Sequence, residues 1–135
     1  MLERWLRAKP PAAAPAAASS DVLDLDLLDG LREAVPDGFC ELVAFFRRNV
    51  PPRLASLRAA AESGETPAVL RAAHSLKGST GNLGASRVAR LFHELELIAG
   101  SGMEDVLGTI ERIEAEYARA DAALATYASQ RPAAP

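Results

Sequence analysis

The sequence predicts an all-α fold, an antiparallel up-down-up-down four-helix bundle with a short additional N-terminal helix. From residue 21 onward, apolar residues recur three and four positions apart, as they do on one face of a helix. The strict alternation typical of strands is absent. Glycine and proline divide this region into one short and four long amphipathic segments joined by short turns, which pack most economically as antiparallel neighbours.

The first helix is expected to begin after Asp24, whose side chain is suited to capping a helix N-terminus. Its inward residues are expected to be Leu27, Leu28, Leu31 and Val35, and Pro36-Asp37-Gly38 ends it. A second helix begins near Asp37 and is expected to kink at Pro51-Pro52 without breaking, because its apolar phase is the same on both sides. The inward stripe of this second helix is Phe39, Leu42, Val43, Phe46, Val50, Leu54, Leu57 and Ala61.

Gly64 ends the second helix, and Thr66-Pro67 predicts the start of a third, with a capping hydroxyl followed by proline at the first helical position. The third helix is expected to run to about Gly81. Gly84 then separates it from a fourth helix, which Gly100-Ser101-Gly102 ends. The predicted inward residues are Val88, Leu91, Leu95 and Ile98 in the fourth helix, and Val106, Ile110, Ile113, Tyr117, Ala120, Leu124 and Tyr127 in the last.

The length of 135 residues fits one domain with a modest core. We expect an N-terminal tail and Pro/Ala-rich linker over residues 1–20, the helical bundle over residues 21–130 and a C-terminal tail over residues 131–135. Residues 2–9 are amphipathic but too short to form a stable helix alone. We therefore favour a frayed tail there over a docking or membrane-surface helix.

Composition argues against several classes of function. A net charge of −3 without a basic stripe argues against nucleic-acid binding. No run approaches the roughly 20 apolar residues that span a bilayer, and the charged opening segment lacks the apolar region of a signal peptide. We therefore expect a cytoplasmic protein with no membrane insertion. The single cysteine, Cys40, cannot form an internal disulfide, and its apolar neighbours predict a buried, inert thiol.

The third predicted helix carries the residues that indicate a function. At about 100° per residue, Val69, Ala73, Leu76 and Thr80 lie on its core side, and Leu83 extends that phase. His74 points nearly the opposite way, surrounded by Leu70, Arg71, Lys77, Gly78 and Gly81. Glycine inside a helix costs about 1 kcal/mol relative to alanine. Two glycines on the face of His74 therefore indicate that a partner approaches the backbone there.

This arrangement suits an anion held on His74. A histidine side chain is largely neutral near pH 7 and keeps a lone pair on one ring nitrogen, so it is a nucleophile without an added base. Lys77, one turn later, can reach a group bonded to the imidazole, and a charge pair about 4 Å apart near a surface is worth on the order of 4 kcal/mol before screening. Phosphoryl transfer needs this kind of alignment and charge neutralisation. No carboxylate cluster surrounds His74, so we expect neither a metal site nor a cofactor on this chain.

The run His74-Ser-Leu-Lys-Gly-Ser-Thr-Gly-Asn-Leu-Gly84 resembles the phosphoacceptor motif of histidine phosphotransfer domains. In that motif the histidine is followed by an apolar residue at the second position, Lys-Gly at the third and fourth, and glycine at the tenth. The similarity extends upstream to Phe45-Phe46 and Pro52-Arg-Leu, and downstream through Leu91-Phe-His-Glu-Leu-Glu96. It covers residues 24–127, nearly everything after the linker.

The resemblance implies a phosphorelay intermediate of a two-component signalling system. His74 would carry the phosphoryl group on Nε2 and exchange it with an aspartate of a receiver domain, and Lys77 would contact that group. Glu96 would hydrogen-bond Nδ1 of His74. His93 together with Glu96 resembles the pair beside the active histidine in the amino-terminal phosphotransfer domain of chemotaxis kinases.

Docking is expected on the His74 face and on an apolar patch of an adjoining helix, for which the second helix is favoured, with Leu70, Arg71, Gly78 and Gly81 taking part. The implied partners are the receiver domain of a response regulator and a sensor or hybrid histidine kinase. The chain is expected to act as a monomer, and Mg²⁺ is expected only in the acidic pocket of the receiver.

Several alternatives remain open on the sequence alone. The domain could be the phosphoacceptor of a chemotaxis-type kinase, phosphorylated in trans, or a helical interaction module without transfer activity. An autophosphorylating kinase core would need glycine-rich ATP-binding loops, which the sequence lacks. A metal-binding bundle would need several inward Glu-x-x-His motifs, whereas His93-Glu-Leu-Glu96 has the reverse order.

Overall fold

The computed structural model describes residues 22–130, so the predicted tails and linker over residues 1–20 and 131–135 lie outside the described part. The described residues form helices and no strand, which confirms the all-α prediction for this part of the chain. The helices are α2 (Leu25–Ala34), α3 (Phe39–Glu62), α4 (Thr66–Asn82), α5 (Ser86–Ile98) and α6 (Met103–Ser129). None of the described helices is long and apolar enough to cross a membrane.

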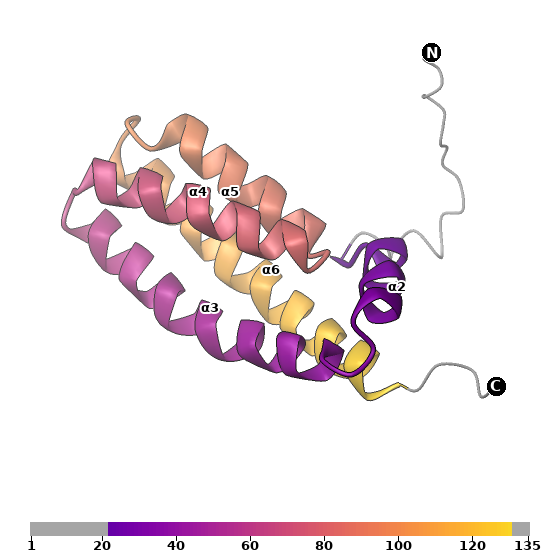
Figure 1. The fold of residues 1–135 in the computed structure, drawn as a ribbon. Helices are drawn as coiled ribbons and strands as arrows, with labels where there is room; N and C mark the ends of the chain where they lie inside the picture. The colour runs from indigo at the N-terminus through magenta and orange to yellow at the C-terminus, as the bar shows by residue number, and fades with distance from the viewer. Residues whose placement is uncertain (1–21, 131–135) are drawn as a thin grey trace, which may run out of the picture.

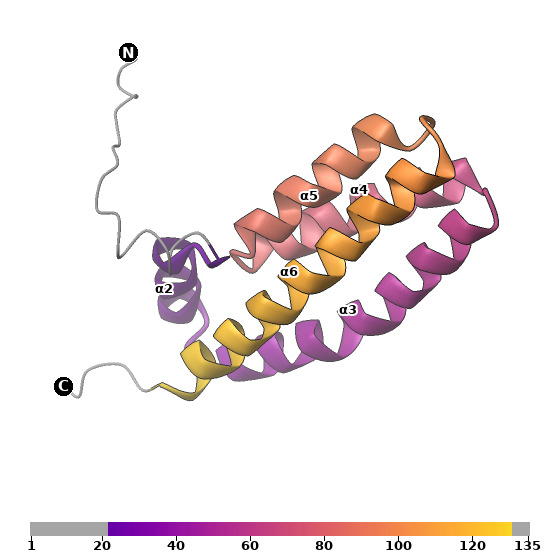
Figure 2. The same ribbon diagram turned by 180° about the vertical axis from the view of Figure 1, so that it is seen from behind.

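The four long helices pack around one core (Figures 1 and 2). Helix α4 packs against α3 and α5, and α6 packs against α5 and α3, so the four helices form a closed ring. Short turns over residues 63–65, 83–85 and 99–102 join successive helices. The inward stripes predicted for α3, α5 and α6 are buried, with the exceptions that Leu42 and Ile98 are half-buried. Period and phase alone therefore predict most of the core.

Helix α3 continues through both prolines. Its apolar phase is the same before and after Pro51-Pro52, with Val50 and Leu54 both in the core. Both prolines are exposed, so the hydrogen bonds that they remove from the helix lie on its outer side. The prediction of one helix across the prolines is confirmed.

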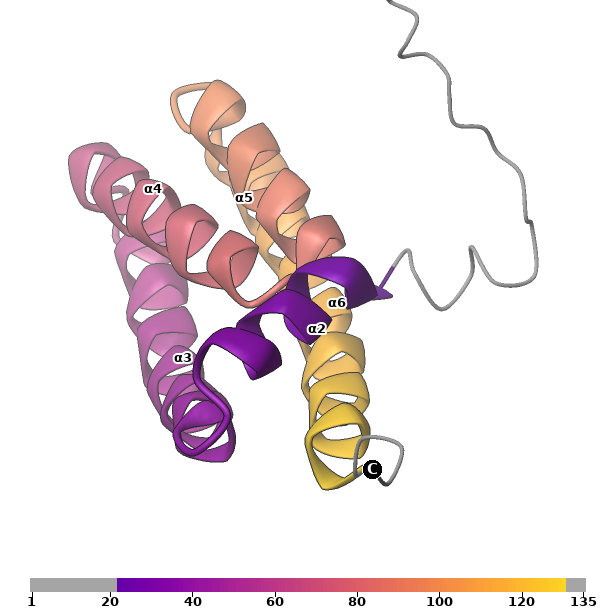
Figure 3. The same cartoon turned by 45° about the vertical axis from the view of Figure 1, so that its right-hand side comes forward.

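Helix α2 lies across one end of the bundle (Figure 3). Asp24 caps it as predicted, since its Oδ1 accepts a hydrogen bond of 3.1 Å from the backbone of Leu27. Leu28 is fully buried, but Leu27 and Val35 are exposed, so the prediction that these two residues point inward is wrong. A helix that crosses the end of a bundle contacts it over a small area. In α2 this area is filled by Leu28, and Leu31 is half-buried.

The turn between α4 and α5 holds the start of α2. The backbone N–H of Asp24 donates to the carbonyl of Gly84 over 2.7 Å. Gly84 has φ +76°, and a Cβ placed on it would lie 3.1 Å from the carbonyl oxygen of Asp24. Both the backbone conformation and the close approach of Asp24 therefore require glycine at this position.

Tyr127 near the end of α6 fixes the other side of α2. Its hydroxyl donates to Asp29, and Arg32 donates to its backbone carbonyl over 2.8 Å. The Arg32 guanidinium lies over the rings of both Tyr127 and Phe39, 4.3 and 5.0 Å from their centroids. Helix α2 is thereby held to α6 and α3 as well as to the α4–α5 turn.

Two further predictions are wrong. Glu65 occupies the position before α4, and Thr66 and Pro67 are already helical, so the hydroxyl of Thr66 does not cap the helix. Cys40 was expected to be buried among apolar neighbours, but its side chain lies on the exposed side of α3. At 100° per residue, Cys40 lies well away from the core direction of Phe39, which the identity of its sequence neighbours does not reveal.

Candidate functional site

Helix α4 presents His74 to solvent. Val69, Ala73, Leu76 and Thr80 are buried on the opposite side, as the helical period predicts. The buried hydroxyl of Thr80 donates to the carbonyl of Leu76 over 2.8 Å, so it leaves no unsatisfied polar group in the core. The side chain of His74 is 76% exposed. The packed helix fixes the backbone of His74, and the exposure of its ring makes the ring accessible to another protein.

Helix α5 supplies the carboxylate that orients this ring. Oε2 of Glu96 lies 3.0 Å from Nδ1 of His74, and Oε1 lies 2.6 Å from Nζ of Lys77. The Glu96 side chain is 19% exposed, so it is more deeply buried than the ring that it contacts. The two oxygens of one carboxylate thus bring together three of the residues that the sequence singled out.

The charge state of Glu96 fixes the tautomer of His74. The hydrogen bond from Lys77 lowers the pKa of Glu96 below its ordinary value, and the hydrogen bond from His74 adds to this, while partial burial acts in the opposite direction. Glu96 is therefore ionised near pH 7, and an ionised carboxylate only accepts hydrogen bonds. The contact requires a proton on Nδ1 of His74, so in the neutral ring the lone pair is on Nε2.

Lys77 and His93 both point to Glu96. Lys77 was expected to contact a phosphoryl group, and the structure places its ammonium in an ion pair with Glu96. An ammonium has three donors, so this pair leaves two for a second anion nearby. Nδ1 of His93 is 3.6 Å from Oε1 of Glu96, and its side chain is mostly exposed. His93 therefore lies beside the carboxylate, on the outer side of the site.

The four residues predicted to take part in docking lie around His74 on α4. Leu70 and Arg71 are exposed one turn earlier. At Gly78, a Cβ would meet no described atom within 4 Å, so nothing in the fold requires glycine there. At Gly81, a Cβ would meet Cβ of Ala89 at 3.9 Å, an ordinary contact with α5. Of the two glycines, Gly78 is the one whose missing side chain leaves open surface next to His74.

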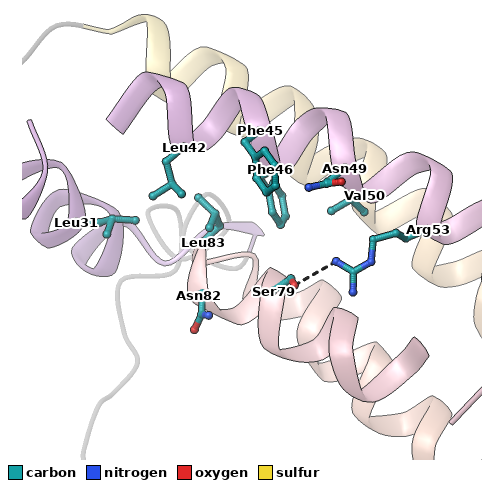
Figure 4. A pocket seen from close by; sticks show the side chains of 10 residues that line it. All are labelled: Leu31, Leu42, Phe45, Phe46, Asn49, Val50, Arg53, Ser79, Asn82 and Leu83. Atoms are coloured by element: carbon teal, nitrogen blue, oxygen red, sulfur yellow. Dashed lines mark hydrogen bonds between the residues drawn. The ribbon is translucent and has the colours of Figure 1, made fainter. Parts of the chain in front are cut away.

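An apolar groove lies on the other flank of α4, along the helix from which an apolar docking patch is predicted. It has a volume of about 570 Å³ and lies between α3, α4 and the end of α2 (Figure 4). Most of its lining is apolar, including Leu42, Val50 and Leu83, and Phe45 stands at its rim with 56% of its surface exposed. The sequence signal for it was present in Phe45-Phe46, two adjacent aromatic residues that cannot both face the core of one helix.

Arg53, from the motif Pro52-Arg-Leu, lies at one end of this groove. Its guanidinium reaches from α3 to α4, where it donates to the hydroxyls of Ser75 and Ser79, the latter over 3.4 Å. Ser75 directly follows His74 in the chain, so Arg53 places a positive charge beside the site on the flank opposite to Glu96.

The chain matches a known protein family and a solved structure. The model of the Hpt domain family matches residues 41–123, a range that includes His74, Lys77, His93 and Glu96. A solved structure that matches is the crystal structure of histidine-containing phosphotransfer protein B (HptB) from Pseudomonas aeruginosa PAO1, with a TM-score of 0.76 and 31% sequence identity. That alignment covers 82% of this chain and 97% of the other. No curated protein matches the chain.

Proposed function

Since the chain belongs to the Hpt domain family, whose members act by histidine phosphotransfer in two-component phosphorelays, we propose that His74 accepts a phosphoryl group on Nε2 and exchanges it with an aspartate of a receiver domain. The observation that carries this proposal is the 3.0 Å contact between Nδ1 of His74 and Glu96, on a ring that is otherwise exposed. It leaves the nucleophilic nitrogen as the one that is not tied to the protein.

The transfer follows from that geometry. The lone pair on Nε2 attacks the phosphorus of the aspartyl phosphate, so an N–P bond forms while the bond between phosphorus and the aspartate oxygen breaks. The aspartate leaves as a carboxylate. The imidazole becomes positively charged with its proton still on Nδ1, and the negative charge of Glu96 stabilises it. The reverse reaction regenerates the neutral ring.

Lys77 supports the phosphorylated state. Its ammonium is held 2.6 Å from Glu96 and is about one-third exposed, so the two donors that the ion pair leaves over are available to a phosphoryl oxygen. Because Glu96 contacts both side chains, it sets the position of the charge as well as the tautomer of the ring. His93 has a supporting part through the same carboxylate.

The proposal assigns docking to the His74 face and to the neighbouring groove. A receiver domain would bury Leu70 and the rim residue Phe45 and would approach the backbone at Gly78. Its own acidic pocket would hold the Mg²⁺ that phosphoryl transfer needs. One chain supplies His74, Lys77 and Glu96, so a monomer suffices, with a sensor or hybrid kinase as the origin of the phosphoryl group.

The up-down-up-down course of the bundle is part of this proposal. It is supported by the short turns between successive helices and by their packing in a closed ring. This course makes α4 and α5 neighbours in both chain and space, which brings Glu96 to His74.

The direct test is a His74→Gln variant incubated with a radiolabelled, phosphorylated receiver domain. Glutamine has no nucleophilic ring nitrogen, and the exposed position tolerates the change without loss of helicity. We expect the wild-type chain to take up label and the variant to take up none. A variant that accumulates label at the wild-type rate would show that His74 is not the acceptor. ATP alone should label neither protein.

A second candidate is the phosphoacceptor domain of a chemotaxis-type kinase. His74, Lys77 and His93 all lie around the carboxylate of Glu96. This arrangement favours the second candidate, because the pair His93 and Glu96 resembles that subfamily. The two candidates differ in their donor. A chemotaxis-type domain is labelled by ATP together with an isolated chemotaxis kinase catalytic domain supplied in trans, whereas a relay intermediate is labelled through a phosphorylated receiver.

A further inference from the structure

Arg53 differs in its partners from five other arginines on the bundle. Arg47, Arg58, Arg87, Arg112 and Arg119 each lie within 4 Å of a carboxylate. Arg53 is half-buried and has no carboxylate partner among the described residues, and its hydrogen bonds go to the neutral hydroxyls of Ser75 and Ser79. Its charge is thus partly desolvated and not neutralised, which is costly unless an anion is supplied from outside.

The two hydroxyls also hold the guanidinium in one place. They come from successive turns of α4, and they anchor the tip of a side chain whose base is on α3. Figure 4 shows the contact between Arg53 and Ser79. A guanidinium that is fixed before binding loses less conformational entropy when it pairs with a carboxylate. Two anchored donors still leave others of its five N–H groups for a planar, acidic partner.

The groove beyond Arg53 shows what accompanies that acidic group. Leu42, Val50 and Leu83 line it, and Phe45 stands at its rim. A partner that fills the groove with apolar side chains brings its own surface across Arg53 at the end nearest His74. The partner surface that fits this groove therefore carries an acidic group at one end and apolar side chains along the rest.

We propose that Arg53 is a specificity-determining residue which selects receiver domains that present a carboxylate next to the apolar side chains they place in this groove. The proposal rests on the proposed function, since the receiver is the partner there. It adds that recognition uses a charge on the flank of α4 opposite to Glu96.

The phosphoryl group itself is not the anion for Arg53. Glu96 holds the His74 ring on the α5 side of α4, whereas Ser75 and Ser79 lie on the α3 side and hold Arg53 there. The phosphoryl site already has Lys77 on the α5 side. Arg53 therefore acts on docking and not on the chemical step, and the two roles give different kinetics.

The experiment uses the receiver domain that the wild-type chain phosphorylates fastest among those of the same organism. Binding of this unphosphorylated receiver is measured by calorimetry in a His74→Gln background, with Arg53→Met, Arg53→Glu and Arg90→Met added in turn. Arg90 is exposed on α5, away from the groove, so Arg90→Met matches the loss of one positive charge. Circular dichroism and thermal unfolding check that each variant folds.

We expect Arg53→Met to raise Kd about tenfold and Arg53→Glu to raise it further, while Arg90→Met stays within about twofold. A receiver variant in which lysine replaces the carboxylate residue that faces Arg53 should bind the Arg53→Glu variant more tightly than the Arg53→Met variant. Phosphotransfer with Arg53→Met at saturating receiver should keep the wild-type rate, because only docking is weakened.

Equal Kd values for Arg53→Met and Arg90→Met would overturn the inference, as would a saturated transfer rate that falls while Kd is unchanged. Neither of these results touches the proposed function, which fails instead if His74→Gln still takes up label. The two hypotheses are therefore decided by separate measurements.

Discussion

Gly78 combines a cost to the helix with open space around it. Glycine inside α4 costs about 1 kcal/mol relative to alanine, and no described atom lies within 4 Å of a Cβ placed there. We predict that Gly78→Gln leaves the thermal midpoint unchanged or raises it and lowers the rate of phosphoryl uptake at least about tenfold, because the side chain occupies the space of the receiver. Thermal unfolding and transfer from a labelled receiver measure the two effects.

Gly108 provides the matched control. It lies inside α6, is exposed and would likewise bring a Cβ within 4 Å of no described atom, but it is distant from α4 in the chain and its helix carries none of the site residues. Gly108→Gln should gain the same helix propensity and transfer at the wild-type rate. Unchanged transfer in Gly78→Gln would mean that no partner approaches that backbone.

The residues on α4 could be predicted from sequence because they share one helix. A period of 3.6 residues is enough to place His74 away from the core side that Ala73 and Leu76 share. Arg53 could not be predicted in the same way, since its contact with Ser75 joins residues of two helices whose relative rotation periodicity does not specify. The contact between Glu96 and His74 also crosses two helices, and its expectation came from the resemblance to a family.

At the scale of elements, the close contact between the start of α2 and the α4–α5 turn depends on Gly84. Alanine there must adopt φ +76° and place a Cβ 3.1 Å from the carbonyl of Asp24. We predict that Gly84→Ala lowers the free energy of unfolding by at least about 2 kcal/mol, from the left-handed backbone and the steric contact together. Urea unfolding measures this loss.

Gly64, in the turn between α3 and α4, separates the two causes. Its φ is +72°, but a Cβ there meets no described atom within 4 Å. Gly64→Ala should therefore lose only the conformational part, about 1 kcal/mol. Equal losses of the free energy of unfolding at the two positions would show that the steric contact with Asp24 contributes nothing to the effect of Gly84→Ala.

Helix α2 is also where sequence reasoning about elements was least successful. Its existence and its cap at Asp24 were predicted, whereas Leu27 and Val35 were wrongly placed inside. In α3 and α6, which pack along their whole length, the predicted apolar stripe is buried except for the half-buried Leu42. When a helix crosses the end of a bundle, its contacts with the other helices decide which of its residues are buried. In α2, the position of Gly84 relative to Asp24 determines those contacts.

At the scale of the whole molecule, both tyrosines of the chain report on the folded state. Burial raises the pKa of Tyr117 to about 12 and the pKa of Tyr127 to about 12, and in Tyr127 the hydrogen bond to Asp29 adds to this. A raised pKa means that folding favours the neutral phenol. Each tyrosine therefore contributes stability that is fully present below pH 10 and is lost as the pH rises toward 12.

We predict that phenolate absorbance of the native protein rises near pH 12, while in urea it rises near pH 10. Stability measured by urea unfolding should fall across the same interval. Since Tyr117 packs on Phe46 and Tyr127 on Phe39, the titration reports on packing between α3 and α6. Native tyrosines that titrate near pH 10 would contradict the burial of these two rings.

Phosphoryl transfer by this protein depends on which of its atoms carries the phosphoryl group. The most direct measurement is nitrogen-resolved nuclear magnetic resonance of the protein after phosphorylation by a receiver domain. We predict one phosphorylated histidine, His74, with phosphorus bonded to Nε2 and the proton retained on Nδ1 beside Glu96. Phosphorus on Nδ1 of His74, on His93 or on any other residue would contradict the account.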